Sequence, residues 1–171
     1  MERFLAIDFE TANTSPDSAC AIGLVLVEDR EIKTKATYLI KPPNELFEFT
    51  HIHRLTWDDV KKEKTFGELW NDIALFFTDI DFVVAHNASF DRKILAACCS
   101  RYGKGMPDVE FRCTKQLSKY VLDIYPSNLA NVSRVLQIDL NHHNALSDTI
   151  ACAKIMLKVK RDKNYLLVAK Q

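Results

Sequence analysis

Asp8 and Glu10 are the first residues in the sequence whose types and spacing could do chemistry. They follow the apolar residues 4–7, which predict a buried strand, and residues two apart on a strand point to the same face. The two carboxylates can therefore share a hard divalent cation, which prefers oxygen ligands. An Asp-x-Glu pair alone is a weak signal among 23 acidic residues. Its place at the rim of a core strengthens it, because an unpaired carboxylate is costly there and ligands bind at the strand ends of α/β sheets.

Two further acids and a histidine lie where other elements begin. Asp91 lies just inside a predicted helix that follows a short apolar strand, residues 82–85. Asp148 lies in the first turns of the last predicted helix, five residues after His143. A histidine side chain has an unperturbed pKa of about 6.5, so it can exchange a proton near neutral pH. Each acid taken alone is more often a solvated surface residue.

The elements that must position these residues follow an α/β order. Strands are predicted where apolar residues alternate or run together, and helices where they recur at helical spacing after a capping residue. Ser89 is expected to cap the helix that carries Asp91. The predicted strands cover residues 4–10, 21–28, 32–40 and 82–85, and the predicted helices cover residues 66–77, 90–98, 114–120, 128–136 and 145–160. This order of strands and helices predicts an α/β fold with a mixed sheet.

Length and composition restrict the class of protein. A chain of 171 residues has the size of one ordinary domain, and 47% hydrophobic with 27% charged residues is typical of a globular protein. Lysine plus arginine and aspartate plus glutamate number 23 each, so no overall positive charge indicates a nucleic-acid partner. A nucleic-acid partner must therefore be inferred from basic residues in one part of the chain. Five basic residues in the middle of the chain could contact phosphates or simply be solvated: Arg92, Lys93, Arg112, Lys115 and Lys119.

No segment of the sequence indicates secretion or membrane insertion. The chain opens on core-like residues without the basic start, apolar stretch and cleavage site of a signal peptide, and no run is long enough to span a bilayer. The five cysteines lack the spacing of a zinc site and are flanked mostly by apolar residues. We expect a cytoplasmic protein with reduced, buried thiols and no membrane partner.

Three short segments resemble the motifs of a known enzyme family. They are DFET at residues 8–11, HNASFD at residues 86–91 and HNALSD at residues 143–148. In this order they resemble the three exonuclease motifs of the DEDDh group, the 3′–5′ exonucleases similar to the DNA polymerase III epsilon subunit. The resemblance implies a ribonuclease H-like three-layer α/β fold with a mixed five-stranded sheet flanked by helices. It also implies that residues 1–161 form the exonuclease domain and residues 162–171 a C-terminal tail.

The resemblance assigns roles to five residues. Two divalent ions, Mg²⁺ or Mn²⁺, would be held by four carboxylates, those of Asp8, Glu10, Asp91 and Asp148. Such ions compensate the mutual repulsion of the carboxylates and stabilise the attacking and leaving oxygens of a displacement at phosphorus. His143 would take the proton from the attacking water. His142 is an adjacent alternative, but only His143 has the His-to-Asp spacing of the family's third motif.

The segment Ile52–His53 resembles the family's isoleucine–histidine pair that lines the pocket for the terminal nucleotide. The chain departs from the family at the next position, where Arg54 replaces a common glycine. This departure concerns the conformation of the loop, and it leaves open the alternative that His53 is an ordinary exposed histidine.

Three more residues are expected near the substrate. The resemblance implies that Thr11 and Ala12 offer backbone N–H groups to the 3′-terminal nucleotide. Phe90 could stack on a base, although a buried aromatic residue at a helix start is the alternative. The implied partners are 3′ ends of single-stranded nucleic acid, and a DNA polymerase or a second copy of the chain are further candidates.

Three functions fit these motifs. The first is a metal-dependent 3′–5′ exonuclease that releases nucleoside 5′-monophosphates from single-stranded DNA during replication or repair. The second is an exoribonuclease resembling ribonuclease T or oligoribonuclease, because no motif reports on the 2′-hydroxyl that distinguishes RNA from DNA. The third is a catalytically idle domain that binds nucleic acid or a polymerase. The presence of all four acids and His143 argues against the third.

Overall fold

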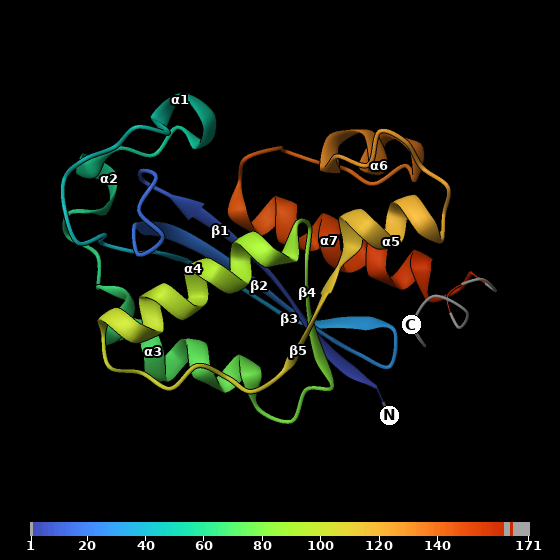
Figure 1. The fold of residues 1–171 in the computed structure, drawn as a ribbon, viewed down its shortest axis with the longest axis horizontal. Coiled ribbons are helices and arrows are strands. Elements are labelled where there is room, and N and C mark those ends of the chain that lie inside the picture. Colours follow the sequence, from blue (N-terminus) through green and yellow to red (C-terminus); the bar gives the residue numbers. More distant parts are fainter. Residues whose placement is uncertain (1, 163–164, 166–171) are drawn as a thin grey trace.

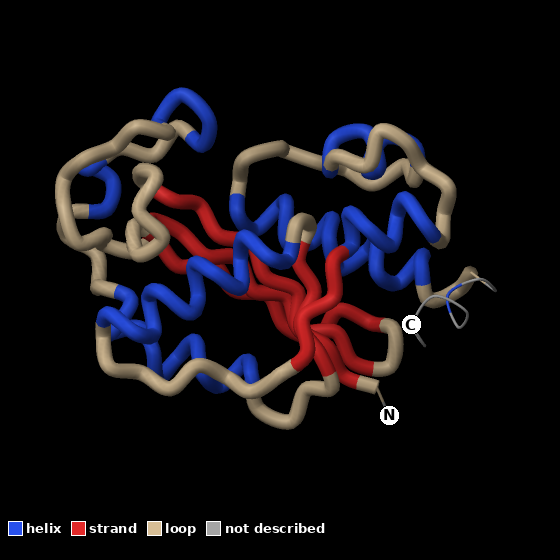
Figure 2. The backbone as a smooth tube through the Cα atoms, viewed as in Figure 1, coloured by secondary structure: helices blue, strands red, loops and turns tan. Residues whose placement is uncertain are grey.

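A mixed five-stranded sheet forms the centre of the molecule. The computed structural model describes residues 2–162 and residue 165, so the predicted tail, 162–171, lies almost entirely outside the described residues. The strands are β1 (Arg3–Thr11), β2 (Ala19–Glu28), β3 (Glu31–Leu39), β4 (Phe82–Ala85) and β5 (Glu110–Cys113). They lie in the order β3-β2-β1-β4-β5, in which β2 is antiparallel to both β1 and β3, β4 is parallel to β1, and β5 is parallel to β4 (Figure 2). The predicted mixed five-stranded sheet is confirmed.

Helices cover both faces of the sheet and complete three layers (Figure 1). One face is covered by α3 (Phe66–Ala74) and α4 (Ala88–Arg101), and the other by α5 (Thr114–Tyr120), α6 (Leu129–Val135) and α7 (Ala145–Val159). The short helices α1 (Thr50–His53) and α2 (Trp57–Val60) and the 3-10 helix η1 (Leu75–Phe77) connect these layers. In the described part of the chain, no helix combines the length and the apolar composition that crossing a membrane requires.

The alternation of side chains along β1 decides where its acids point. Phe4 and Ala6 pack into the core cluster that contains α7, whereas Leu5 and Ile7 pack into the cluster that contains α3 and α4. Because successive strand residues point to opposite faces, Asp8 and Glu10 continue the Phe4 series and face the side of α7. The strand therefore presents its two carboxylates to the helix that carries the third motif.

Two details of the second motif region differ from the sequence prediction. Helix α4 begins at Ala88, so Ser89 lies inside it and is not its N-cap. Asn87 precedes the helix in the left-handed conformation, with φ of 93°, which turns the chain sharply from β4 into α4. The strand β5 was not predicted, because its four residues, EFRC, do not form a continuous apolar run like the residues FVVA of β4.

No disulfide joins any of the five cysteines, all of which lie in the described part of the chain. Four of them are buried, and Cys113 is only partly buried.

Candidate metal centre and active site

Asp91 reaches the end of β1 from α4. Its Oδ1 atom accepts a hydrogen bond of 3.0 Å from the backbone N–H of Phe9, the residue between Asp8 and Glu10. Asp91 is 2% exposed. Burial raises the pKa of Asp91 to about 7, and the Phe9 N–H opposes this rise by stabilising the carboxylate. The second motif is thereby tied to the strand that carries the first.

Asp148 approaches the same point from the first turn of α7. The carboxylate oxygens of Asp8, Glu10 and Asp148 lie within 4.8 Å of one another. With Asp91 bonded to the intervening Phe9, all four predicted acids converge on one end of the sheet.

A glycine on β2 allows this approach. Gly23 pairs with Asp8 in the β1–β2 ladder. A Cβ atom at position 23 would lie 2.3 Å from the carbonyl oxygen of Ala145 and 2.3 Å from Oγ1 of Thr149, so only glycine fits beneath α7 here. Sequence reasoning did not single out Gly23, although a glycine inside an apolar strand is a signal of close backbone approach.

The Asp148 carboxylate is only half satisfied by the protein. Its Oδ2 atom accepts a 3.1 Å hydrogen bond from the His143 N–H and lies 2.9 Å from Nδ1 of His142. Its Oδ1 atom is buried and has no hydrogen-bond partner among the described residues. A buried carboxylate oxygen without a donor is costly unless a cation compensates it.

The electrostatics of the cluster also favour a cation. Burial raises the pKa of Asp8 well above its ordinary value, with further contributions from Asp91, Asp148 and Glu10. Burial and the Asp148 charge raise the pKa of Glu10 to about 7. Carboxylates in this state must bind either protons or a positive ion, and all their donor atoms are the hard oxygens that Mg²⁺ and Mn²⁺ prefer. The donor set therefore fits divalent ions.

Two histidines border the acids. The rings of His142 and His143 stack with their centroids 3.8 Å apart and an angle of 19° between the planes. Burial and the neighbouring His142 lower the pKa of His143, so its imidazole is mainly neutral at neutral pH and able to accept a proton. Together with Asp8, Glu10 and Asp148 they line a pocket of about 250 Å³, whose other walls include His86, Asn87, Lys115 and Asn128.

His86 is fully engaged within the protein. Its Nδ1 lies 3.0 Å from Oγ1 of Thr114, and its Nε2 lies 2.9 Å from the carbonyl oxygen of Ser127. Burial lowers its pKa to about 4. With both ring nitrogens occupied, His86 links the end of β4 to α5 and to the loop before α6, and it offers no free atom to a metal.

His53 lies buried beside the end of β1, not exposed. Its Nε2 lies 3.1 Å from the carbonyl oxygen of Thr11, and its Nδ1 accepts a 3.1 Å hydrogen bond from the Leu55 N–H. These partners require the tautomer in which Nε2 carries the proton. Arg54 adopts the left-handed conformation, with φ of 67° and ψ of 0°, so the turn keeps a backbone shape that glycine favours. Ile52 is 38% exposed.

The other predicted substrate residues differ in their availability. Thr11 and Ala12 are both buried at the end of β1. The Ala12 N–H already donates a 2.8 Å hydrogen bond to the carbonyl oxygen of Ser18. Phe90 is 42% exposed, so the alternative of a buried helix-start aromatic is wrong.

Arg112 is held within the protein. Its guanidinium donates to both carboxylate oxygens of Glu110 and to the Tyr165 hydroxyl, and it stacks 3.8 Å from the centroid of the Phe82 ring. A role for Arg112 in fixing the edge strand β5 accounts for these contacts better than one in binding phosphate.

Comparison with known sequences also indicates an exonuclease. The sequence model RNase_T, described as an exonuclease, matches residues 5–156. The chain is 28% identical to DNA polymerase III PolC-type of Thermotoga petrophila over 91% of its length, and 28% identical to the 3′-5′ exonuclease DinG of Bacillus subtilis over 92%. It is 29% identical to exodeoxyribonuclease 10 of Escherichia coli over 93%. The chain spans only 12% of the PolC-type polymerase and 18% of DinG, but 69% of exodeoxyribonuclease 10.

Solved structures share the fold at low sequence identity. Exonuclease X, solved with 5′ overhanging duplex DNA, matches with a TM-score of 0.74 and 22% identity over 92% of this chain and 91% of that one. The nuclease domain of 3′hExo, a DEDDh family member bound to rAMP, matches with a TM-score of 0.80 and 17% identity over 96% and 94%. E. coli exonuclease I with a dT13 oligonucleotide matches with a TM-score of 0.81 and 16% identity over 99% and 43%. The ribonuclease H-like fold expected from the motifs is confirmed.

Proposed function

The chain belongs to the RNase_T family of exonucleases and to its DEDDh group, and from this premise we propose that it removes nucleoside 5′-monophosphates from the 3′ end of single-stranded DNA. Exonucleases of this group depend on divalent metal ions. The observation that carries the proposal is the convergence of the Asp8, Glu10 and Asp148 carboxylates, with Asp91 bonded to the intervening Phe9. Four acids that converge on one strand end, one of which has a buried and unpartnered carboxylate oxygen, are difficult to explain without bound cations.

We assign the two expected ions, Mg²⁺ or Mn²⁺, to the carboxylates of Asp8, Glu10, Asp91 and Asp148. Bound there, the ions would supply the charge that stabilises the attacking and leaving oxygens of an in-line displacement at phosphorus. His143, neutral at neutral pH, would take one proton from the attacking water. The water oxygen forms the new bond to phosphorus, the bond from phosphorus to the 3′ oxygen of the preceding nucleotide breaks, and that oxygen takes a proton from solvent to become the new 3′ hydroxyl. His142 is assigned a supporting role, through its contact with Asp148 and its stacking on His143.

The terminal nucleotide is assigned to the space beside the end of β1. Thr11 and His53 are assigned to one wall of this space, because the His53 ring is hydrogen-bonded to the Thr11 carbonyl. The partly exposed side chains of Ile52 and Phe90 remain available for apolar contact or stacking with a base. Ala12 is a weaker candidate for an N–H contact, since its N–H is bonded to Ser18.

We assign the substrate and partners from the nucleic acids bound in similar solved structures and from the names of similar proteins. Exonuclease X and exonuclease I were solved with DNA, which supports DNA as the substrate here. The similarity to the nuclease domain of 3′hExo bound to rAMP favours the second candidate, an exoribonuclease. The match to a PolC-type polymerase makes a polymerase a candidate partner, alongside a second copy of the chain. We further propose that residues 1–161 form the exonuclease domain.

Digestion of labelled oligonucleotides tests this function. Matched DNA and RNA single strands, labelled at the 5′ or the 3′ end, would be incubated with Mg²⁺, Mn²⁺ or EDTA. The proposal expects a ladder that shortens from the 3′ end of the 5′-labelled DNA, immediate release of a labelled mononucleotide from the 3′-labelled DNA, and no reaction in EDTA. Faster digestion of RNA would replace the first candidate by the exoribonuclease. Internal cleavage, digestion from the 5′ end or activity in EDTA would contradict both.

A further inference from the structure

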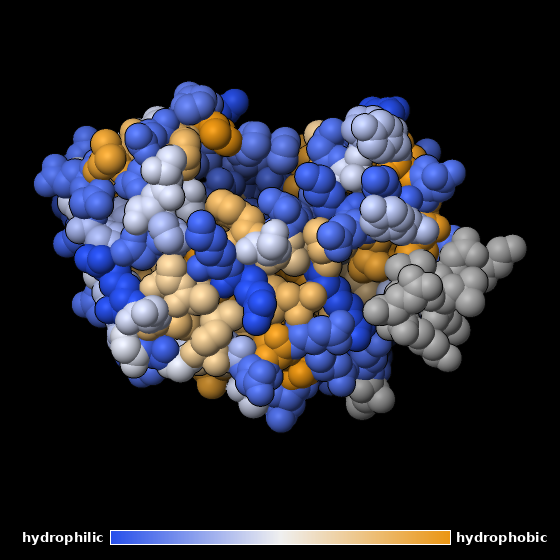
Figure 3. Space-filling view, viewed as in Figure 1, coloured by the Kyte–Doolittle hydropathy of each residue, from blue (hydrophilic) through white to orange (hydrophobic). Residues whose placement is uncertain are grey.

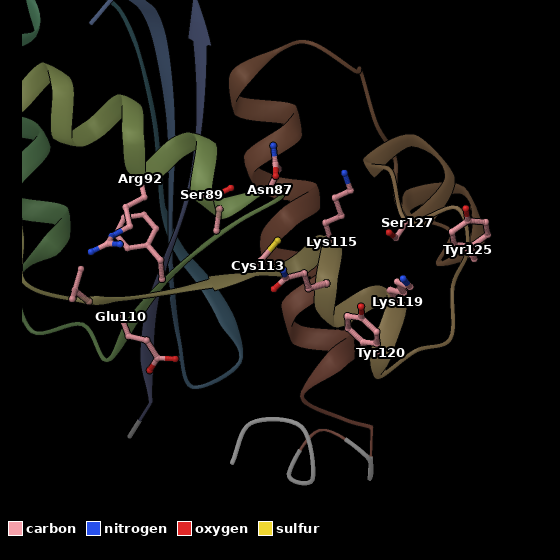
Figure 4. Close-up of a pocket in the computed structure, with 14 residues that line it drawn as sticks. Asn87, Ser89, Arg92, Glu110, Cys113, Lys115, Lys119, Tyr120, Tyr125 and Ser127 are labelled. Atoms are coloured by element: carbon pink, nitrogen blue, oxygen red, sulfur yellow. The ribbon is translucent and has the colours of Figure 1, made fainter. Parts of the chain in front are cut away.

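A second groove lies directly beside the metal-binding pocket. It has a volume of about 800 Å³ and shares Asn87 and Lys115 with that pocket, so the two are continuous. Figure 4 shows Arg92 on one side of the groove, Tyr120 and Tyr125 on the other, and Lys115 between them. The groove therefore leads away from the four carboxylates between the start of α4 and the region of α5 and α6.

The groove carries a local positive charge despite the neutral balance of the whole chain. Its lining includes three basic side chains, Arg92, Lys115 and Lys119. Among the described residues, none of the three forms a salt bridge. The acid in its lining, Glu110, is already paired with Arg112. Unpaired cations in a concave site attract an anionic ligand.

The groove also offers aromatic faces. Tyr125 is 81% exposed and Tyr120 is 63% exposed, and Nζ of Lys119 lies 5.0 Å from the centroid of the Tyr120 ring. Figure 3 shows hydrophilic residues interspersed with hydrophobic ones over α5 and α6. Basic side chains interleaved with exposed aromatic rings are the combination that binds single-stranded nucleic acid, through phosphates and stacked bases respectively.

We propose that this groove binds the nucleotides on the 5′ side of the scissile phosphate, as a single strand. Arg92, Lys115 and Lys119 contact its phosphates, and Tyr125 and Tyr120 stack on its bases. This inference rests on the proposed function, because it assumes that the 3′ end of the strand lies among the carboxylates. It adds that selection of longer, single-stranded substrates resides in a surface separate from the metal centre.

The test compares two substrates that differ only in whether they reach the groove. A 5′-fluorescein dT12 strand occupies both sites, whereas the p-nitrophenyl ester of thymidine 5′-monophosphate has no upstream nucleotide. The track variant is Arg92→Ala with Lys119→Ala, which leaves Lys115 of the metal pocket intact. Its matched control is Lys62→Ala with Lys64→Ala, which removes the same charge from exposed positions outside the groove. Circular dichroism melting verifies that every variant is folded.

For the track variant we expect the ratio of kcat/KM for dT12 over that for the ester to fall at least tenfold. The slope of log kcat/KM for dT12 against log salt should weaken by about 1.4, since each phosphate contact on a single strand contributes roughly 0.7. Tyr125→Ala should weaken dT12 binding roughly tenfold, whereas Tyr125→Phe should retain it, because stacking needs the ring and not the hydroxyl. The control pair should leave the ratio and the slope unchanged.

An unchanged ratio and slope in the track variant, in a protein that hydrolyses both substrates, would overturn the groove assignment while leaving the proposed function intact. A wild-type protein that hydrolyses neither substrate would instead overturn the function. In that case, fluorescence anisotropy of dT12 in EDTA still decides the inference. Loss of dT12 binding in the track variant, with binding retained in the control, supports the groove assignment. Retention of dT12 binding in both variants overturns it, and so does binding of blunt duplex DNA as tight as that of dT12.

Discussion

The backbone N–H of Phe9 donates a hydrogen bond to the carboxylate of Asp91, a residue 82 positions later in the sequence. This bond joins α4, which packs on one face of the sheet, to the strand whose neighbouring acids point to the other face. It places the buried carboxylate of Asp91 beside Asp8 and Glu10, and burial and mutual repulsion raise the pKa of all three acids. The cluster thus lowers the stability of the metal-free fold in exchange for a place to bind cations.

Asp8→Asn should abolish turnover and should not destabilise the metal-free protein at pH 8. The substitution would keep the size of the side chain but remove the charge whose burial and neighbours raise the pKa of Asp8. The free energy of unfolding in EDTA, measured by urea denaturation, should equal or exceed that of the wild type. The exposed Asp139→Asn is the control and should change neither quantity. Near-normal turnover by Asp8→Asn would remove Asp8 from the site.

The metal-free protein should lose stability from its acid cluster as the pH rises. Burial raises the pKa of Glu10 and of Asp91 to about 7 from ordinary values of 4.5 and 3.8. The folded state therefore binds protons more tightly than the unfolded state, and this contribution is complete below pH 4 and lost as the pH passes 7. Mg²⁺ should restore stability increasingly above pH 7, where it no longer competes with protons.

The titration of His86 changes stability with pH in the opposite direction, so a variant is needed that isolates the contribution of the acids. Its pKa is lowered to about 4 by burial, and its contribution is lost as the pH falls from about 6.5 toward 4. The double variant Glu10→Gln, Asp91→Asn retains His86 and lacks the acids. Urea unfolding in EDTA at pH 5, 6, 7 and 8 should show the variant gaining stability over the wild type as the pH rises. A constant difference would contradict the raised pKa values.

His143→Ala should lower the rate by roughly 10²–10⁴-fold, the effect of losing a general base. The carboxylates remain, so the increase in melting temperature on adding Mn²⁺ should persist. His142→Ala should have the smaller effect, since its contact is with Asp148 and its ring only stacks on His143. The reverse ranking of the two variants would assign proton transfer to His142.

Gly23→Ala should impair both the fold and the metal centre. The added methyl group would meet Ala145 and Thr149 at 2.3 Å, and moving α7 away would carry Asp148 from Asp8. Overpacking of this kind costs about 1–3 kcal/mol of unfolding free energy. Gly105→Ala is the control, because a Cβ there meets no atom within 4 Å. Equal stability and equal Mn²⁺ affinity in the two variants would show that α7 tolerates a shift at this contact.

Arg54→Gly should stabilise the protein by about 1 kcal/mol or less. Glycine has no Cβ and so avoids the steric penalty of the left-handed conformation, but it loses more backbone entropy on folding, which limits the gain. Arg54 is exposed, with φ of 67°. Urea denaturation measures the change, and Arg92→Gly, inside α4, should be destabilising instead. Destabilisation by Arg54→Gly would mean that the arginine side chain supports the loop.

The sequence predicted those parts of the fold that local patterns determine. Alternation along residues 4–10 placed Asp8 and Glu10 on one face, and helical spacing located α3, α5, α6 and α7 to within a few residues. The convergence of these acids with Asp91 and Asp148 came from the resemblance of the motifs and not from periodicity. The geometry of the site agrees with that expectation.

The remaining features depend on contacts between distant segments. The close approach of α7 to Gly23 cannot be read from either segment alone, because it exists only after both have packed. The same holds for the burial of His53, which follows from its bond to Thr11 on another element. Ser89 failed as an N-cap because the turn after β4 places Asn87 in a left-handed conformation, which local capping preferences do not report.

Anomalous diffraction from crystals soaked in Mn²⁺ tests the central claim, that four distant acids form one site for divalent ions. We expect two anomalous peaks about 3.5–4 Å apart, in contact with the carboxylates of Asp8, Glu10, Asp91 and Asp148. Crystals of Asp8→Asn should lose at least one of them. Manganese bound elsewhere, with no peak at these carboxylates, would contradict the account.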